Sequence, residues 1–234
     1  MLSAFTEAVR RSGGRAVCLA AILLAVVRPD RVSAQGFLSK FSYDNLKPSA
    51  LQLDLGPVGG NNIRGTLTGG LRLDYGFIAP HVRVLLGVSF FKADFSSAAR
   101  ARFEQRLRSV VIDPSADDTI RLGRISWSDV TGDVDLQYVL PQGRAVTTYL
   151  GIGLGAHIRH GSGPAINGTF VQDALNSITA GLNGMIGAEV GAKRWRFTLE
   201  ARGVLSSGLS TASLRSGVMY RWAGTAGKAR GTGQ

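Results

Sequence analysis

The sequence predicts an all-β protein, an eight-stranded antiparallel up-and-down transmembrane β-barrel. Six of eight strand-like segments alternate apolar residues with small or charged ones, as in residues 150–159, LGIGLGAHIR. A period of two suits a strand with one apolar and one polar face, and it does not suit a helix. The connections between the segments alternate between short and long, and an apolar leader precedes them all. In a membrane barrel, apolar side chains face lipid and polar side chains face the lumen.

The leader, residues 1–34, has the features of a cleaved signal peptide. Three arginines precede the apolar stretch 16–27, and the small-x-small site 32–34 precedes Gln35. This stretch is shorter than the roughly 20 residues that a helix needs to span a bilayer. Cys18, the only cysteine, lies within it. We therefore expect an exported chain without disulfides or cysteine metal ligands.

The rest of the chain is long enough for one barrel. We expect an N-terminal lead-in at 35–48, the barrel at 49–223 and a flexible basic C-terminal tail at 224–234. The 31 glycines are about twice the usual share, and many lie inside strand-like segments, where they fit crowded or bent barrel positions. The net charge is +11, but the arginines are spread along the strands, which argues against nucleic-acid binding.

Four strands are expected in the first half of the barrel. Their apolar rows are Leu51, Leu53 and Leu55 in 49–56; Leu67, Leu71 and Leu73 in 64–77; Val82, Val84, Leu86, Val88 and Phe90 in 81–91; and Val134, Leu136 and Leu140 in 125–140. The fourth strand loses its alternation at residues 127–130, so we expect a β-bulge there.

Four more strands are expected in the second half. Their apolar rows are Leu150, Ile152, Leu154 and Ile158 in 145–159; Leu182, Ile186, Ala188 and Val190 in 180–192; Leu199 and Ala201 in 195–202; and Leu214 and Val218 in 211–222. The tight connections 78–80, 141–144 and 193–194 all fall on one side of such a barrel, where they make short periplasmic turns. Two long extracellular loops follow the third and fifth strands, and each contains a helix-favouring segment, 97–111 and 170–178.

Aromatic residues gather on the apolar faces near the tight turns. These residues are Tyr75, Phe77, Tyr138, Trp195, Phe197, Tyr220 and Trp222. Amphipathic rings favour the headgroup zone of a bilayer, so we interpret this set as an aromatic girdle.

Charged residues share the opposite, inward parity. The predicted lumen charge network comprises Arg72, Asp74, Arg83, Asp133, Asp135, Glu189, Arg196, Glu200, Arg202 and Arg215. Eight strands leave an interior just wide enough to be filled by side chains, and buried charges must be paired. We expect a plugged lumen, with Glu200 paired to one or more of Arg196, Arg202 and Arg215. A narrow channel is the alternative.

By this pattern, residues 49–222 resemble the small eight-stranded outer-membrane β-barrels of the OmpA-like and OmpX-like superfamily. The resemblance implies residence in the outer membrane of a Gram-negative bacterium after Sec export. It also implies contact with outer-membrane lipid and lipopolysaccharide, and help from periplasmic chaperones and the barrel-assembly machinery. We expect a monomer, although the sequence itself does not determine the oligomeric state. Residues 220–222 are similar to the aromatic last strand that this machinery recognises, although twelve residues follow them here.

Motifs for other chemistry are weak. The segment 151–156 matches a dinucleotide fingerprint, but strand alternation continues through it, whereas that motif needs a helix. His157, His160 and Ser162 could suggest an enzyme that modifies lipid acyl chains, but no acid stands nearby in sequence. Arg100, Arg102, Arg106 and Arg108 could contact lipopolysaccharide. We expect no enzyme, cofactor or metal, and a structural or surface-interaction role; a porin-like channel is the first alternative.

Overall fold

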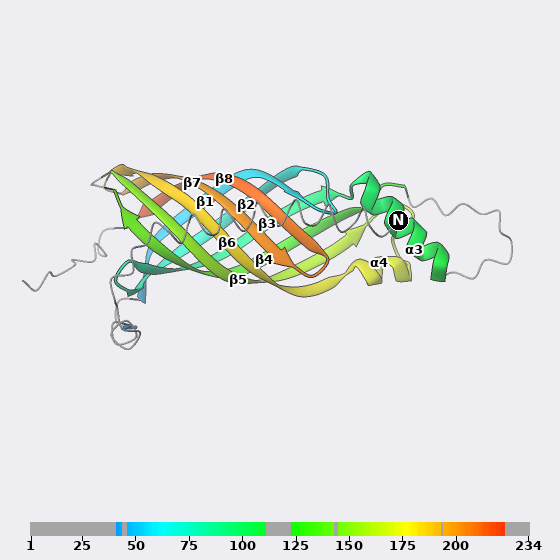
Figure 1. The fold of residues 1–234 in the computed structure, drawn as a ribbon, viewed down its shortest axis with the longest axis horizontal. Helices are drawn as coiled ribbons and strands as arrows, with labels where there is room; N and C mark the ends of the chain where they lie inside the picture. Colours follow the sequence, from blue (N-terminus) through cyan, green and yellow to red (C-terminus); the bar gives the residue numbers. More distant parts are fainter. Residues whose placement is uncertain (1–40, 44–45, 111–122, 143–144, 193, 223–234) are drawn as a thin grey trace, which may run out of the picture. The chain divides into compact units, whose positions relative to one another are not determined.

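The computed structural model confirms the predicted fold, a closed barrel of eight antiparallel strands in sequence order (Figure 1). It describes residues 41–43, 46–110, 123–142, 145–192 and 194–222. The predicted signal peptide and C-terminal tail lie outside these residues. The strands are β1 (Leu46–Gly60), β2 (Thr66–Ala79), β3 (Val82–Asp94), β4 (Ser126–Pro141), β5 (Val146–Ser162), β6 (Ser177–Ala192), β7 (Trp195–Ser206) and β8 (Leu209–Arg221).

The alternation in the sequence separates the two faces of the barrel wall. In β1, Leu53 is 66% exposed, whereas its neighbours Gln52 and Asp54 are each 3% exposed. In β5, Leu154 is 68% exposed, whereas the next inward side chain, His157, is 4% exposed. An outer surface of exposed leucine, isoleucine and valine over a polar interior is the pattern of a barrel that crosses a bilayer.

The strand register fixes the width of the barrel. The residue paired with Ile178 of β6 can be followed from strand to strand once around the barrel. The path returns to β6 at Ala188, ten residues further along the strand. This stagger on eight strands gives a strongly tilted, narrow barrel whose interior side chains can fill it.

The bulge occurs in a different place from the one predicted. Residues 126–138 pair continuously with β3, and all of β4 pairs continuously with β5, so the bulge expected at 127–130 is wrong. The register shifts instead between Asp74 and Phe77 of β2, where Gly76 has φ +94°. Glycine adopts this conformation without the steric cost that a Cβ adds. The shift sets Phe77 opposite Arg83, so Phe77 does not continue the outward row of β2.

The two ends of the barrel differ. Residues 80–81, 142–145 and 193–194 connect strands at one end, which we call the turn end. The other end, the loop end, has the connections 61–65, 95–125, 163–176 and 207–208. Its long connections contain the predicted helices, α3 (Ser97–Val110) and α4 (Phe170–Leu175), which lie beyond the same end of the barrel (Figure 1). Within the described residues, neither helix is long and apolar enough to cross a membrane.

The loop end has a small hydrophobic core of its own. Buried Ile125, Ile166, Val171 and Leu175 pack together, and Phe95, Phe103 and Trp127 cover them. The rings of Phe95 and Trp127 meet edge to face at 4.7 Å. This loop-end core joins the two long connections, so α3 and α4 are anchored and do not hang free in solvent.

Candidate functional site

The polar interior of the barrel is the candidate site. All ten residues of the predicted lumen network point inward and are less than 10% exposed. They come from β2, β3, β4, β6, β7 and β8, so most of the partners meet only because the sheet closes. Their contacts form three layers along the barrel.

The middle layer is centred on Glu200 of β7. Both of its oxygens accept hydrogen bonds from the Arg72 guanidinium, at 2.6 and 2.7 Å. The Tyr149 hydroxyl donates to the same carboxylate at 3.0 Å, and Arg202 Nε donates at 3.2 Å. Arg202 also donates to Asp135. A bidentate arginine pair with further donors is among the strongest polar arrangements in proteins.

The layer at the turn end is centred on Glu189 of β6. Its carboxylate accepts hydrogen bonds from Arg83, from Arg196 at 3.0 Å and from Arg221 at 3.1 Å. The guanidinium of Arg83 also donates twice to Gln137 Oε1, at 2.8 and 2.7 Å. One buried carboxylate therefore binds arginines from three strands.

The layer at the loop end contains two residues that sequence reasoning left out of the network, Asp129 and Arg159. Arg159 Nε donates to Asp129 Oδ2 at 2.9 Å, and Thr131 Oγ1 donates to Asp129 Oδ1 at 2.6 Å. His157 Nδ1 lies 2.9 Å from Thr131 Oγ1 and 3.2 Å from Asp129 Oδ1. Asp129 has the same parity as Asp133 and Asp135 in the sequence. A bulge at 127–130 would have reversed that parity, so the sequence analysis did not assign Asp129 to the lumen.

Among the described residues, arginines and acids inside the barrel are equal in number. Seven arginines (Arg72, Arg83, Arg159, Arg196, Arg202, Arg215 and Arg221) form ion pairs with seven acids (Asp54, Asp74, Asp129, Asp133, Asp135, Glu189 and Glu200). Some pairs are looser: Arg215 lies 3.4 Å from Asp54, and Arg202 Nη1 lies 3.3 Å from Asp133 Oδ1. Buried charge is tolerated when it is compensated in this way.

Glycines in the wall make room for these side chains. A Cβ on Gly153 of β5 would lie 1.9 Å from Asp135 Oδ1, and a Cβ on Gly87 of β3 would lie 2.5 Å from Asp133 Oδ1. Real Cβ atoms essentially never approach other atoms this closely, so any side chain at either position would displace the adjacent carboxylate. The glycine-rich strands thus leave room for the inward-facing carboxylates of Asp133 and Asp135.

The predicted aromatic girdle lies mainly on the outer face. Tyr138, Trp195, Phe197 and Trp222 are exposed, and Tyr75 and Tyr220 are half-buried. The rings of Trp195 and Tyr220 are 4.8 Å apart. Phe77, as described above, is the exception.

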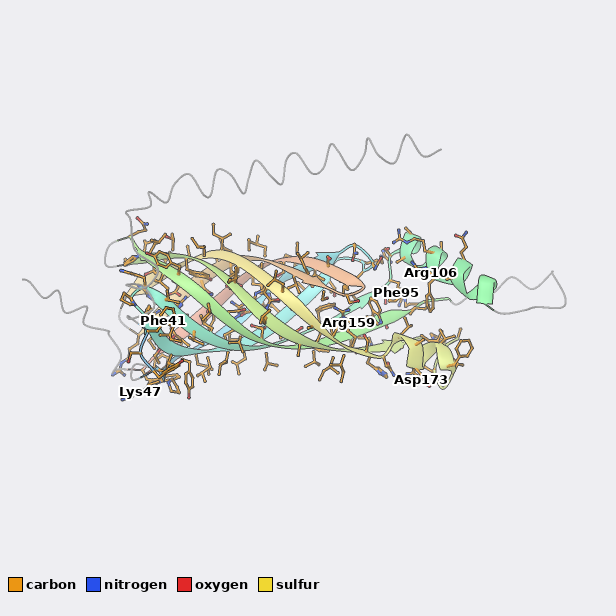
Figure 2. All side chains as sticks on the ribbon, turned by 60° about the horizontal axis from the view of Figure 1, so that its bottom comes forward. Phe41, Lys47, Phe95, Arg106, Arg159 and Asp173 are labelled. Carbon is orange, nitrogen blue, oxygen red and sulfur yellow. The ribbon has the colours of Figure 1, made fainter. Side chains whose placement is uncertain are left out.

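The arginines of α3 have mixed surroundings. Arg100 Nη1 donates to the Gly123 carbonyl at 3.1 Å, and Arg102 Nη2 donates to Asn62 Oδ1 at 3.0 Å. Arg106 is exposed on the same helix (Figure 2), and the side chain of Arg108 lies outside the described residues.

The residues considered for an enzyme do not come together. His160 is exposed and its Nε2 lies 3.3 Å from Gln172 Nε2, while Ser162 Oγ lies 2.9 Å from Ser126 Oγ. Within the described part of the chain, the acid that lies within hydrogen-bond distance of a histidine is Asp129, and that histidine is the buried His157.

Comparison with known proteins supports the fold. No protein-family model and no curated protein matches the sequence. Among solved structures, neisserial surface protein A covers 74% of this chain and 96% of its own, with a TM-score of 0.51 and 11% identity. The N-terminal barrel of Pseudomonas aeruginosa OprF (TM-score 0.44, 11% identity, 75% and 98% covered) and Yersinia pestis Ail (0.43, 12%, 75% and 99%) also match. The chain has the fold of the small eight-stranded outer-membrane β-barrels.

Proposed function

We propose that this protein is a non-enzymatic outer-membrane barrel with a structural and surface-interaction role, whose lumen is closed by paired charges. The carrying observation is the balanced set of seven arginines and seven acids inside the barrel. An open pore would leave such side chains in water, whereas here Arg83, Glu189 and Glu200 are at most 1% exposed. The loop end, with its own hydrophobic core, supplies the ordered surface for recognition.

The closed lumen is tested by conductance in planar lipid bilayers. We expect the unaltered protein to show no steady channels, because buried ion pairs occupy the cross-section. The double variant Arg72→Ala/Glu200→Ala removes one arginine and one acid, so the charges stay balanced while space opens. It should conduct measurably more than the unaltered protein. Steady channels of large conductance in the unaltered protein would favour the porin-like alternative.

We also propose that α3 contacts the anionic groups of lipopolysaccharide. Its sequence holds four arginines and one glutamate, and Arg102 and Arg106 are exposed at the loop end. In outer-membrane barrels the longer loops face the cell exterior, where lipopolysaccharide lies. Exposed cations attract such groups, and salt screens the attraction.

Binding to purified lipopolysaccharide tests this second proposal. An exposed charge pair is worth about 0.2–1 kcal/mol, so the loss of two cations in Arg102→Gln/Arg106→Gln should weaken binding roughly two- to thirtyfold at low salt. Lys47→Gln/Arg194→Gln is the matched control, because it also removes two exposed cations, which lie at the turn end (Lys47 is labelled in Figure 2). Equal loss in both variants would show that binding follows net charge and not α3.

A further inference from the structure

A pocket of about 380 Å³ lies in the wall of the barrel at the loop end. It is lined by residues 64–66, where the β1–β2 connection enters β2, and by residues 92–94 at the end of β3. Phe95, which directly follows the second segment, is labelled at the loop end in Figure 2. Two exposed cations, Arg64 and Lys92, belong to the lining. The pocket is therefore a concave surface that carries positive charge.

The two cations of the pocket are not neutralised by its acid. Asp94 also lines the pocket, but its Oδ2 lies 3.4 Å from Arg124 Nε, and the two form an ion pair. Within the described residues, the side chains of Arg64 and Lys92 form neither an ion pair nor a hydrogen bond. Three cations and one acid leave this part of the wall with a net formal charge of +2. Such a surface attracts anions.

The backbone around the pocket is fixed by hydrogen bonds. The Arg64 N–H donates to the Asp94 carbonyl at 2.8 Å, and Thr66 Oγ1 donates to the Lys92 carbonyl at 2.9 Å. The neighbours of Arg64 and Lys92 in sequence belong to a buried hydrophobic cluster, which comprises Val58, Ile63, Phe91, Ala93 and Leu209. The pocket is thus formed before any ligand binds, which lowers the cost of binding.

The pocket lies where the outer wall changes from apolar to polar. In β3 the last apolar residue of the outward row is Phe90, which is 50% exposed, and the next residue of that row is Lys92. The adjacent strand β4 changes at the same place, since Phe90 pairs with Val130 and Lys92 pairs with Ser128. If the apolar outer surface faces lipid, this change marks the level of the lipid headgroups.

The charge and the position of the pocket define its ligand. A phosphate monoester carries a charge of about −1.5 to −2 at neutral pH, which matches two cations better than the single charge of a phosphodiester does. Arginine and lysine both bind phosphate. Leu67, which directly follows Thr66, is 62% exposed on the outer wall and continues its apolar surface together with Phe90. A membrane lipid carries phosphate and hydrocarbon at these two adjacent levels.

From these observations we propose that the pocket binds the phosphate monoester headgroup of a membrane lipid. Arg64 and Lys92 hold the phosphate, and an acyl chain lies along Leu67 and Phe90. The site belongs to the barrel wall and does not depend on the lipopolysaccharide contact proposed for α3. Either proposal can therefore fail while the other holds.

Lipid titration followed by native mass spectrometry tests the class of ligand. The folded protein, purified from membranes in a non-ionic detergent, is titrated with dioleoyl phosphatidic acid, which is a monoester. It should bind this lipid roughly two- to fivefold more tightly than dioleoyl phosphatidylglycerol, a diester with less negative charge. Glycerol 3-phosphate lacks the acyl chains and should not displace the lipid at equal concentration. Equal binding of the two lipids, or displacement by glycerol 3-phosphate, would overturn the assignment to a lipid monoester.

Two charge variants locate the site. Arg64→Gln/Lys92→Gln should weaken binding of the first phosphatidic acid molecule roughly two- to thirtyfold, because two exposed charge pairs are lost. Lys47→Gln/Arg194→Gln removes as many cations at the turn end, and it should change this binding by less than about twofold, because salt screens distant exposed charges. Equal weakening in the two variants would show that binding follows net charge, and it would overturn the pocket.

Gly65 allows a test in which both cations stay in place. A Cβ at this position would have the Val58 carbonyl oxygen, at 4.0 Å, as its nearest neighbour, so the pocket lining accepts a side chain here. Gly65→Asp adds a carboxylate that competes with the phosphate and should weaken phosphatidic acid binding, whereas Gly65→Asn has the same size without the charge and should leave it nearly unchanged. Equal affinity of the folded Asp and Asn variants would contradict a phosphate bound in this pocket.

Discussion

Glu200→Ala is expected to lower the free energy of unfolding by roughly 3–5 kcal/mol, because breaking a buried ion pair leaves its partner charge without compensation. Glu200 is 1% exposed and accepts two hydrogen bonds from Arg72 and one each from Arg202 and Tyr149. Among the described residues, alanine would leave Asp54, whose Oδ2 lies 3.5 Å from Arg72 Nε, as the remaining ion-pair partner of Arg72. Urea unfolding in lipid vesicles, followed by heat-modifiable migration on gels, measures the loss.

Two control variants separate charge burial from a general effect of losing an acid. Asp173→Ala removes an exposed carboxylate on α4 (Figure 2) and should change stability by less than about 0.5 kcal/mol. Arg72→Met/Glu200→Leu replaces both partners with apolar groups and should cost less than Glu200→Ala alone. A loss below about 1 kcal/mol for Glu200→Ala would mean that lumen water solvates Arg72 well enough to replace the carboxylate.

The faces of the strands could be predicted from the sequence because side-chain direction in a strand depends only on parity. The sequence places Glu200 and Arg202 on one inward row, two residues apart, and in the structure they pair at 3.2 Å. The shortest contact of Glu200 to an arginine is to Arg72, 128 residues away. That pair depends on barrel closure and on the ten-residue stagger, which are properties of the whole sheet. Parity predicts that two side chains face the lumen. It does not predict whether they lie at the same level along the barrel axis and can therefore contact each other.

The loop end could be predicted less well than the wall. The sequence indicated both helices, but the loop-end core depends on Ile125 and Ile166 from different connections meeting in space. Irregular segments have no fixed period, so their buried residues have no signature comparable to strand alternation. The incorrect prediction of a bulge at 127–130 has a related cause. Trp127 has the inward parity of β4, and its large ring interrupts the expected polar row. The ring is there because it packs against Phe95 of the loop-end core.

The orientation of the wall in a bilayer leads to the second large effect. Leu154 is the middle residue of β5 (Val146–Ser162) and is 68% exposed on the outer face. If the apolar outer surface faces lipid, this position lies near the bilayer midplane. The outer faces of the neighbouring strands are apolar here too, since Leu154 pairs with Val134 and Leu182.

Leu154→Arg is therefore expected to cost roughly 2–4 kcal/mol of folding free energy in a bilayer, or to block insertion, because a guanidinium at the midplane loses its hydration. Leu140→Arg is the control for depth: Leu140 is also on the outer face, but it lies beside Pro141, the last residue of β4 at the turn end. Near the headgroups the same substitution should cost only about 0–1 kcal/mol.

Urea titration of both variants in vesicles measures the difference between their free energies of unfolding. A fluorescent probe on a single cysteine at position 154 gives a second test, since lipid-borne reagents should quench it and aqueous ones should not. Equal costs at the two positions, or an aqueous-accessible probe at 154, would contradict the membrane orientation, since a soluble barrel has no gradient of polarity along its wall.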